Sequence, residues 1–164
     1  MVLAVQFYDV VVWLHITAAI LAFGPTFGYA FFQAIAERTN PRAIPTVMQG
    51  IRTIDRFLVT PGVLVLVAAG IYLTVDGPWE FSDAFVAFGI AAAVILLILA
   101  HTFFAPTAGR LAEIAERDVA AAGGGEVELS EEYLALSKRS GGVGTFAGLL
   151  VIITVYFMAA KPFL

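Results

Sequence analysis

The stretch "WLHITAAILAFGPTFGYAFF", residues 13–32, sets the fold class because it contains no Asp, Glu, Lys or Arg. A helix needs about 20 such residues to cross the roughly 30 Å of bilayer hydrocarbon. Further apolar tracts bring the set to four, at about 7–36, 57–75, 84–105 and 143–160. The chain of 164 residues is 60% hydrophobic and 13% charged, whereas a soluble domain is about half apolar and about a quarter charged. We therefore predict an all-α bundle of four transmembrane helices in one domain, residues 1–164.

The basic residues predict how this bundle is oriented. Loops rich in Lys and Arg stay in the cytoplasm. Eight of the nine basic residues fall between the first and second or the third and fourth tracts, and only Lys161 lies elsewhere. The segments 37–56 and 110–139 are therefore expected in the cytoplasm. Both termini and the 76–83 connection are expected outside, which makes the chain a multi-pass protein of the cell (inner) membrane.

The two predicted cytoplasmic segments contain helical signals of their own. After Pro45 a mixed polar and apolar stretch predicts a helix that leads into the second span. In "LSEEYLALSKRSGG", Ser130 is suited to cap a helix, acidic residues occupy its first turn and basic residues its last. The glycines that follow predict the end of this short helix.

Composition excludes several classes of function. The chain has no cysteine, which excludes disulfides, thiolate metal sites and cysteine nucleophiles. It has no glycine-rich phosphate loop, no nucleophile elbow and no HExxH motif. Its basic residues are interleaved with acidic ones, so no nucleic acid is expected as a partner. The sequence leaves enzymatic activity undecided, but it offers no convergent catalytic residues, and this favours a non-enzymatic role in the lipid bilayer.

Two halves of the sequence resemble each other. The motif "FGPTFG" at 23–28 matches "FAPTAG" at 104–109, and "IAER" follows both, at 35–38 and 114–117. "TPGVLVLVAAGIYLTVDGP" from Thr60 aligns with "TFAGLLVIITVYFMAAKP" from Thr145 with a slip of one residue. We predict two related helical hairpins, residues 1–80 and 81–164. Their equal orientation would relate them by an axis along the membrane normal, as in parallel-repeat folds.

The repeated motif places Pro25 and Pro106 at matching positions. Each proline removes one backbone hydrogen bond and is expected to kink its helix. A kinked scaffold helix is the favoured interpretation, and a gating hinge is the alternative.

Two pairs of glycines stand four residues apart, at Gly24 and Gly28 and at Gly144 and Gly148. Such pairs let helices approach closely in a membrane. They serve either the core of the bundle, which we favour, or a homodimer. A homodimer or a larger membrane complex is accordingly the expected protein partner.

His15 and His101 are the only histidines, and both lie inside predicted spans. Intramembrane ionisable residues are functional candidates, although an interhelical hydrogen bond is the structural alternative. The repeat puts His101 roughly 7–8 Å away from His15 in depth, so one iron shared by both within a chain is not expected. Met158 is closer in depth, and His/Met ligation of haem iron is a known type. His15 is therefore the first candidate as a cofactor or metal ligand, followed by His101 and Met158, although packing alone also accounts for Met158.

The residues 13–32 quoted above, together with "TPGVLVLVAAGIYLTVDGPWEFS" at 60–82, resemble a bacterial family of predicted integral membrane proteins of unknown function. More distantly, "LHI…AFG" is similar to the first helix of the copper-resistance D-type and membrane protoporphyrinogen oxidase-type proteins. That second resemblance implies haem b with His15 as its ligand. The chain departs from the pattern at Phe23, where tryptophan is expected, and it lacks the basic residue that those oxidases place further along the helix.

Three functions remain open at this point. The first is a haem b-binding protein with a redox or electron-transfer role. The second is a small transporter or channel that works as an oligomer, with the proline kinks as moving parts. The third is a structural or accessory subunit of a larger membrane complex.

Overall fold

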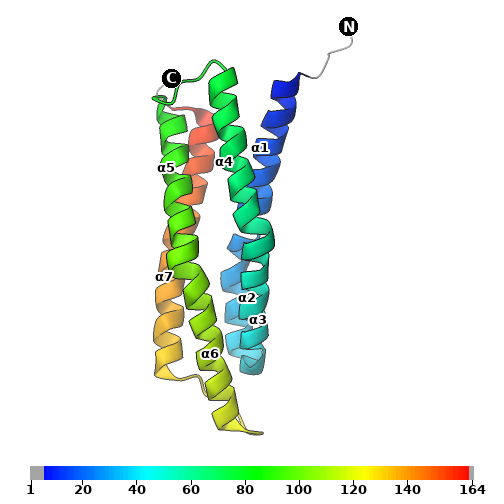
Figure 1. The fold of residues 1–164 in the computed structure, drawn as a ribbon. Coiled ribbons are helices and arrows are strands. Elements are labelled where there is room, and N and C mark those ends of the chain that lie inside the picture. The colour runs from blue at the N-terminus through cyan, green and yellow to red at the C-terminus, as the bar shows by residue number, and fades with distance from the viewer. Residues whose placement is uncertain (1–5, 163–164) are drawn as a thin grey trace.

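The computed structural model describes residues 6–162 and confirms the all-α prediction, since 87% of these residues are helical and none of them lies in a strand. Figure 1 shows helices running side by side along one axis. Their bounds are α1 Phe7–Phe23, α2 Thr26–Thr39, η1 Pro41–Ala43, α3 Ile44–Ile54, η2 Asp55–Val59, α4 Thr60–Asp76, α5 Ala84–Leu99, η3 Ala100–Phe104, α6 Ala105–Ala122 and α7 Glu131–Ala160.

These elements join into four rods that are long and apolar enough to cross a membrane, as the sequence predicted. They cover Phe7–Thr39, Pro41–Asp76, Ala84–Ala122 and Glu131–Ala160. The third has 39 residues and at 1.5 Å per residue is about 58 Å long, against roughly 30 Å of hydrocarbon. The rods therefore extend well beyond the apolar tracts that the sequence marks.

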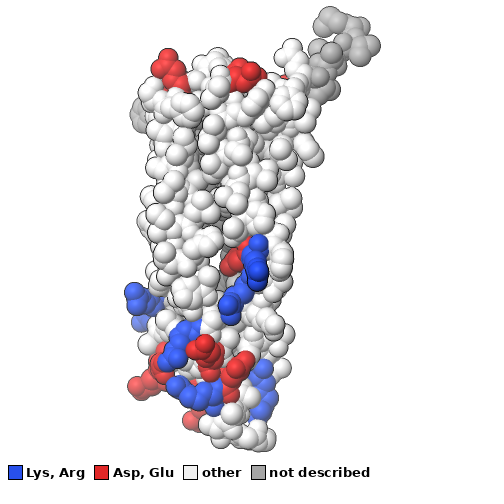
Figure 2. All heavy atoms as spheres, in the orientation of Figure 1, with Lys and Arg blue, Asp and Glu red and all other residues white. Residues whose placement is uncertain are grey.

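The charged side chains define the two ends of the bundle. On the face that Figure 2 shows, they gather at the end formed by α2, α3, α6 and the start of α7, which we call the arginine-rich end. A few acidic groups mark the opposite end, and one small charged group lies on the side of the bundle between them. The helix ends at Phe7 and Ala160 lie at that opposite end (Figure 1). The prediction about the chain termini concerns residues 1 and 164, which lie outside the described residues.

Different helix pairs hold the two ends of the bundle together. Toward the end opposite the arginines, α1 packs on α4 and α5 packs on α7. At the arginine-rich end α3 packs on α6, and α2 and α7 complete a compact core. The buried residues of this core are Ala36, Ile44, Met48, Ala108, Leu111, Ile114, Ala115 and Tyr133.

The two prolines of the repeated motif lie next to different departures from regular α-helix. At Pro25 the regular α-helix of the first rod is interrupted, since α1 ends at Phe23 and α2 begins at Thr26, whose hydroxyl donates to the carbonyl of Phe23 at 2.7 Å. At Pro106 the rod continues, and the five-residue π-helical turn η3 comes directly before α6. A second π-helical turn, η2, precedes Pro61 in the same way. Such turns are frequent at functional sites.

The helix that follows Ser130 is longer than the sequence predicted. The Ser130 hydroxyl accepts from the backbone N–H of Tyr133, as expected of a helix cap. The expected end at Gly141 and Gly142 is wrong, since α7 runs without interruption to Ala160. Within the described chain only Gly123, among the glycines, has a positive φ, of 55°. The glycines of α7 are therefore ordinary helical residues.

Candidate functional site

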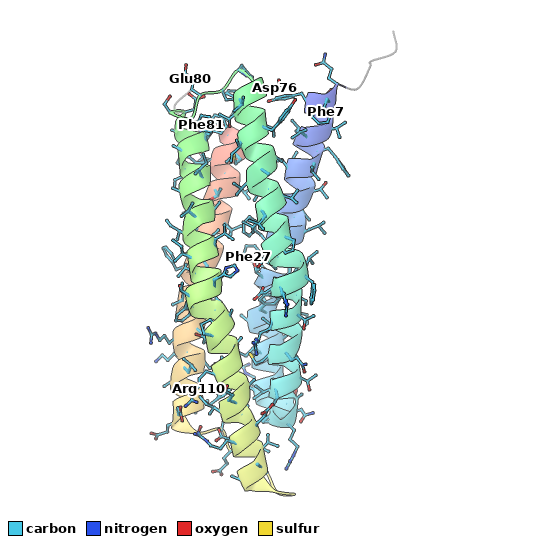
Figure 3. The ribbon with its side chains drawn as sticks, in the orientation of Figure 1. Phe7, Phe27, Asp76, Glu80, Phe81 and Arg110 are labelled. Carbon is cyan, nitrogen blue, oxygen red and sulfur yellow. The ribbon has the colours of Figure 1, made fainter. Side chains whose placement is uncertain are left out.

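A partly open cavity of about 560 Å³ lies between α2, the α3–η2 segment, the η3–α6 segment and α7. We call it the central cavity. Phe23 from α1 and Leu96 from α5 close its apolar side, and Phe27 lies against it. Figure 3 shows Phe27 midway along the bundle, between Phe7, Asp76 and Glu80 at one end and Arg110 at the other.

Small side chains on α7 leave room for this cavity. Ser140, Gly144 and Gly148 all face it. A Cβ atom added at Gly144 would meet nothing within 4 Å, and one added at Gly148 would lie 3.5 Å from the ring of Phe27. An α7 with large residues at these positions would fill the space between the helices. The second predicted glycine pair therefore lines a cavity, and Gly144 makes no close helix contact.

One end of the cavity carries a hydrogen-bonded carboxylate. Oε1 of Glu37 accepts three hydrogen bonds, from Nε2 of Gln33 at 2.9 Å, from the hydroxyl of Tyr133 at 2.9 Å and from the hydroxyl of Ser137 at 2.8 Å. Gln33 also donates to Ser137 at 2.9 Å. Glu37 thereby ties α2 to α7, and the network holds its side chain in one orientation.

A second carboxylate lines the cavity at Asp55, the first residue of the π-helical turn η2. Its Oδ1 accepts a hydrogen bond from the hydroxyl of Tyr29 at 2.9 Å, which links η2 to α2. The other π-helical turn, η3, lines the same cavity through Ala100 and Phe104. Both π-helical turns thus border the central cavity.

The level of Asp55 corresponds to a membrane boundary. From Asp55 to Asp76 the helix rises about 32 Å, which matches the ~30 Å thickness of the hydrocarbon. The cavity extends from apolar walls within that thickness, such as Phe23 and Ile152, to Glu37 beyond it. It therefore offers an apolar compartment on one side of the boundary and a polar one on the other.

The structure places His15 between two helices and outside the central cavity. Its Nδ1 lies 2.9 Å from the backbone oxygen of Leu66 on α4. Since a carbonyl oxygen only accepts, Nδ1 carries the hydrogen. The ring edge rests on Gly70, where an added Cβ would lie 3.1 Å from Cε1.

The other two predicted ligands lie elsewhere. The Nδ1 atom of His101 bonds to the carbonyl of Leu97 in its own rod at 3.0 Å, and the side chain is exposed. Met158 fills the space that Gly89 leaves on α5. His15, His101 and Met158 thus have separate surroundings, and none of them lines the central cavity. Among residues 6–162 no three His, Asp or Glu side chains gather as a metal site would require.

Close helix contact depends on glycines other than the first predicted pair. Added Cβ atoms at Gly24 and Gly28 would meet only atoms of their own rod, at Ile20 and Phe32. An added Cβ at Gly62 of α4 would instead lie 3.1 Å from the Cβ of Ala22 on α1. Gly62 and Gly70 are therefore the residues that let α1 approach α4.

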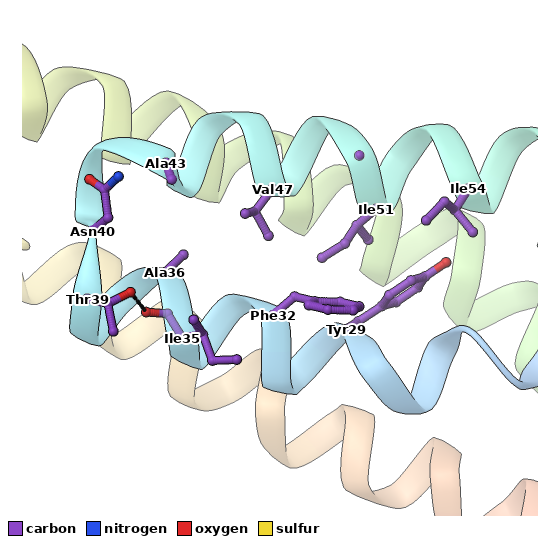
Figure 4. A pocket seen from close by; sticks show the side chains of 11 residues that line it. Tyr29, Phe32, Ile35, Ala36, Thr39, Asn40, Ala43, Val47, Ile51 and Ile54 are labelled. Carbon is purple, nitrogen blue, oxygen red and sulfur yellow. Dashed lines mark hydrogen bonds between the residues drawn. The ribbon is translucent and has the colours of Figure 1, made fainter.

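A second, smaller hollow of about 330 Å³ runs between α2 and α3. Figure 4 shows its apolar walls, including Phe32, Val47 and Ile51, and the bond of 2.7 Å from the hydroxyl of Thr39 to the carbonyl of Ile35. Tyr29 borders both this groove and the central cavity. No charged residue lines the groove in the described part of the chain.

The fold and the site together define a multi-pass α-helical membrane protein with an amphiphilic internal cavity. The chain matches, over residues 9–162, the family described as Predicted integral membrane protein (DUF2269), and it belongs to that family. No curated protein and no solved structure matches it.

Proposed function

We propose that the protein binds a small amphiphilic molecule in the central cavity and exchanges it with the surrounding membrane, as a carrier or small transporter does. The observation that supports this role is the place of the cavity across the membrane boundary. An amphiphile in a bilayer has its polar group at the boundary and its apolar part in the hydrocarbon. The cavity reproduces this division, with carboxyl, hydroxyl and amide groups at one end and aromatic and aliphatic side chains at the other.

The same proposal includes the orientation of the bundle. We place the arginine-rich end in the cytoplasm of a bacterial cell, with the protein in the inner membrane, because loops rich in Lys and Arg remain there. The polar end of the cavity would then face the cytoplasmic leaflet. Oligomerisation or assembly with a larger membrane partner belongs to this proposal too, since large apolar side chains such as Phe31 and Phe57 are more than 70% exposed on the sides of the rods.

The absence of native cysteine allows a direct test with a single reporter. Ser140→Cys puts a thiol on the cavity wall with a change of one atom, and Gly142→Cys puts one nearby on α7 outside the cavity. We expect 1-decanol, added to the protein in lipid nanodiscs, to slow the reaction of the Ser140→Cys thiol with N-ethylmaleimide. At ten times its dissociation constant, occupancy alone gives a slowing of about tenfold. The Gly142→Cys thiol should react at an unchanged rate.

A matched pair of leucine substitutions shows whether the cavity is responsible. Gly144→Leu directs a side chain into the cavity, whereas Gly142→Leu makes the same change at a residue that has open space but does not line it. Gly144→Leu should abolish the effect of 1-decanol on the Ser140→Cys thiol, and Gly142→Leu should leave it. Equal behaviour of the two leucine variants would contradict the proposal.

Haem b binding at His15, with a redox or electron-transfer role, is the second proposal. Ligating histidines donate their other ring N–H to a carbonyl or carboxylate, which fixes the ring and leaves the second nitrogen for the metal. The bond from Nδ1 of His15 to Leu66 has this form. His101 and Met158 have surroundings separate from those of His15. Of these three candidate ligands, such a haem would therefore be bound by His15 alone. The distant resemblance to haem-associated oxidases supports the same proposal.

An absorption spectrum of the detergent-purified protein, oxidised and dithionite-reduced, tests the haem proposal. We expect a Soret band with α and β bands on reduction, and we expect His15→Leu to lose it while the protein still elutes as a single species. A spectrum with no band after haem is supplied, or a band that persists in His15→Leu, would show that His15 is a packing and hydrogen-bonding residue.

A further inference from the structure

Building on the ligand-binding role proposed above, we infer that the molecule held in the central cavity is an organic cation, an amine or quaternary ammonium group that carries an apolar chain. Asp55 and Glu37 give the polar part of the cavity its negative charge. Both carboxylates line the cavity, and they come from different rods.

Each carboxylate keeps one oxygen available to a ligand. All the side-chain hydrogen bonds that Glu37 accepts go to Oε1, and the one that Asp55 accepts goes to Oδ1. In the described residues no buried side-chain oxygen lacks a hydrogen-bond partner. Oε2 of Glu37 and Oδ2 of Asp55, which have no such partner, must therefore keep accessible surface. The hydrogen bonds hold the carboxylates in place and leave a face of each open.

No basic side chain of the described chain lies within ion-pair distance of these two groups. The ion pairs there join Arg110 and Arg117 to acidic residues of α6 and α7. No Lys or Arg lines the central cavity in residues 6–162. A partly buried carboxylate without a neighbouring cation carries a desolvation cost. A cationic ligand relieves that cost, whereas an anionic one would increase it.

The arginines at the same level are directed to other groups. The guanidinium of Arg56 lies 5.5 Å from the centre of the Phe57 ring, and that of Arg139 lies 5.6 Å from the centre of the Phe103 ring. Arg52 reaches toward α6, with Nη1 3.5 Å from the position that a Cβ of Gly109 would take. None of the three lies within ion-pair distance of Asp55 or Glu37 in the described structure. The negative charge of the cavity therefore stays available.

Aromatic rings complete the site for a cation with apolar substituents. Tyr29 contacts Asp55 through its hydroxyl, and Phe23, Phe27 and Phe104 border the same cavity. The faces of such rings attract ammonium groups, most strongly where water is excluded. The apolar chain of the ligand would extend toward Leu96 and Ile152, within the depth of the hydrocarbon.

Three amphiphiles of equal chain length and different charge test the inference: decyltrimethylammonium, decyl sulfate and 1-decanol. Each is titrated over the same range of membrane-bound concentrations against the full chain with Ser140→Cys in nanodiscs. The rate of maleimide modification is measured at each concentration. We expect decyltrimethylammonium to protect the thiol at a concentration at least about tenfold below that of 1-decanol, and decyl sulfate to protect least. Asp55→Asn with Glu37→Gln should raise the concentration of decyltrimethylammonium required by at least about tenfold and remove its advantage over 1-decanol.

The outcomes separate this inference from the broader role. Equal protection by all three amphiphiles would overturn the cationic class and leave the cavity as a ligand site. Stronger protection by decyl sulfate would also overturn it and would indicate an anionic ligand. Protection by none of them would overturn both proposals. The comparison of charges uses intact carboxylates, so it remains decisive if the double variant does not fold.

Discussion

Replacing Gly62 with leucine is expected to lower the free energy of unfolding by about 3 kcal/mol, the upper part of the range for overpacking a well-packed contact. An added Cβ at Gly62 would lie 3.1 Å from the Cβ and 3.4 Å from the Cα of Ala22. Ala22 is 0% exposed and has no room to move away. The side chain of leucine would push α1 from α4 and strain the bond between His15 and Leu66 in the same interface.

Reversible unfolding of the detergent-solubilised protein in increasing sodium dodecyl sulfate measures this loss. Gly142→Leu is the matched control, because it makes the same change in a helix where an added Cβ meets nothing within 4 Å. The control should unfold at the wild-type midpoint or above it, since leucine has the higher helix propensity. A shared midpoint for the two variants would mean that close approach of α1 and α4 does not limit stability.

The sequence was sufficient to predict the four spans, but it predicted a helix end incorrectly. Runs without charge, such as residues 13–32, identify membrane helices because each residue there must avoid exposing polar groups to lipid. Gly141 and Gly142 predict a helix end, yet α7 continues through them. Glycine permits a helix end without requiring one, and only the backbone geometry distinguishes the two cases.

The carboxylates of the candidate site were missed for a related reason. Glu37 and Asp55 fall in the segment 37–56, whose arginines mark it as cytoplasmic and solvated. In the structure the inner face of this segment borders the central cavity. The available signal was the series Ile44, Met48 and Ile51, whose spacing fits one face of a helix and places Asp55 four residues further along that face. The triple hydrogen bond on Glu37 had no such signal, because Gln33, Tyr133 and Ser137 come together only through packing.

The second large effect is expected at the arginine-rich end, where Leu111→Ala should cost about 2–5 kcal/mol. Leu111 is 1% exposed and lies in the core formed by α2, α3, α6 and α7, together with Ile114 and Met48. It stands about 40 Å along the rod from Ala84, so this core lies beyond the hydrocarbon. Water surrounds it, and burial of apolar surface stabilises it as in a soluble protein. The interface of α1 and α4 lies within lipid and lacks that driving force.

Amide hydrogen exchange followed segment by segment measures where the loss occurs. In Leu111→Ala the amides of α3 and α6 should exchange faster, while those of α5 within the hydrocarbon should keep their protection, because the bilayer holds that helix independently of the aqueous core. Leu134→Ala is the control, since Leu134 is 51% exposed at the same end of the bundle. If both variants exchanged alike, hydrophobic burial would not hold the arginine-rich end together. If Leu111→Ala opens the arginine-rich end, the hydrogen bonds to Glu37 should also weaken, since α2 and α7 pack on the same core.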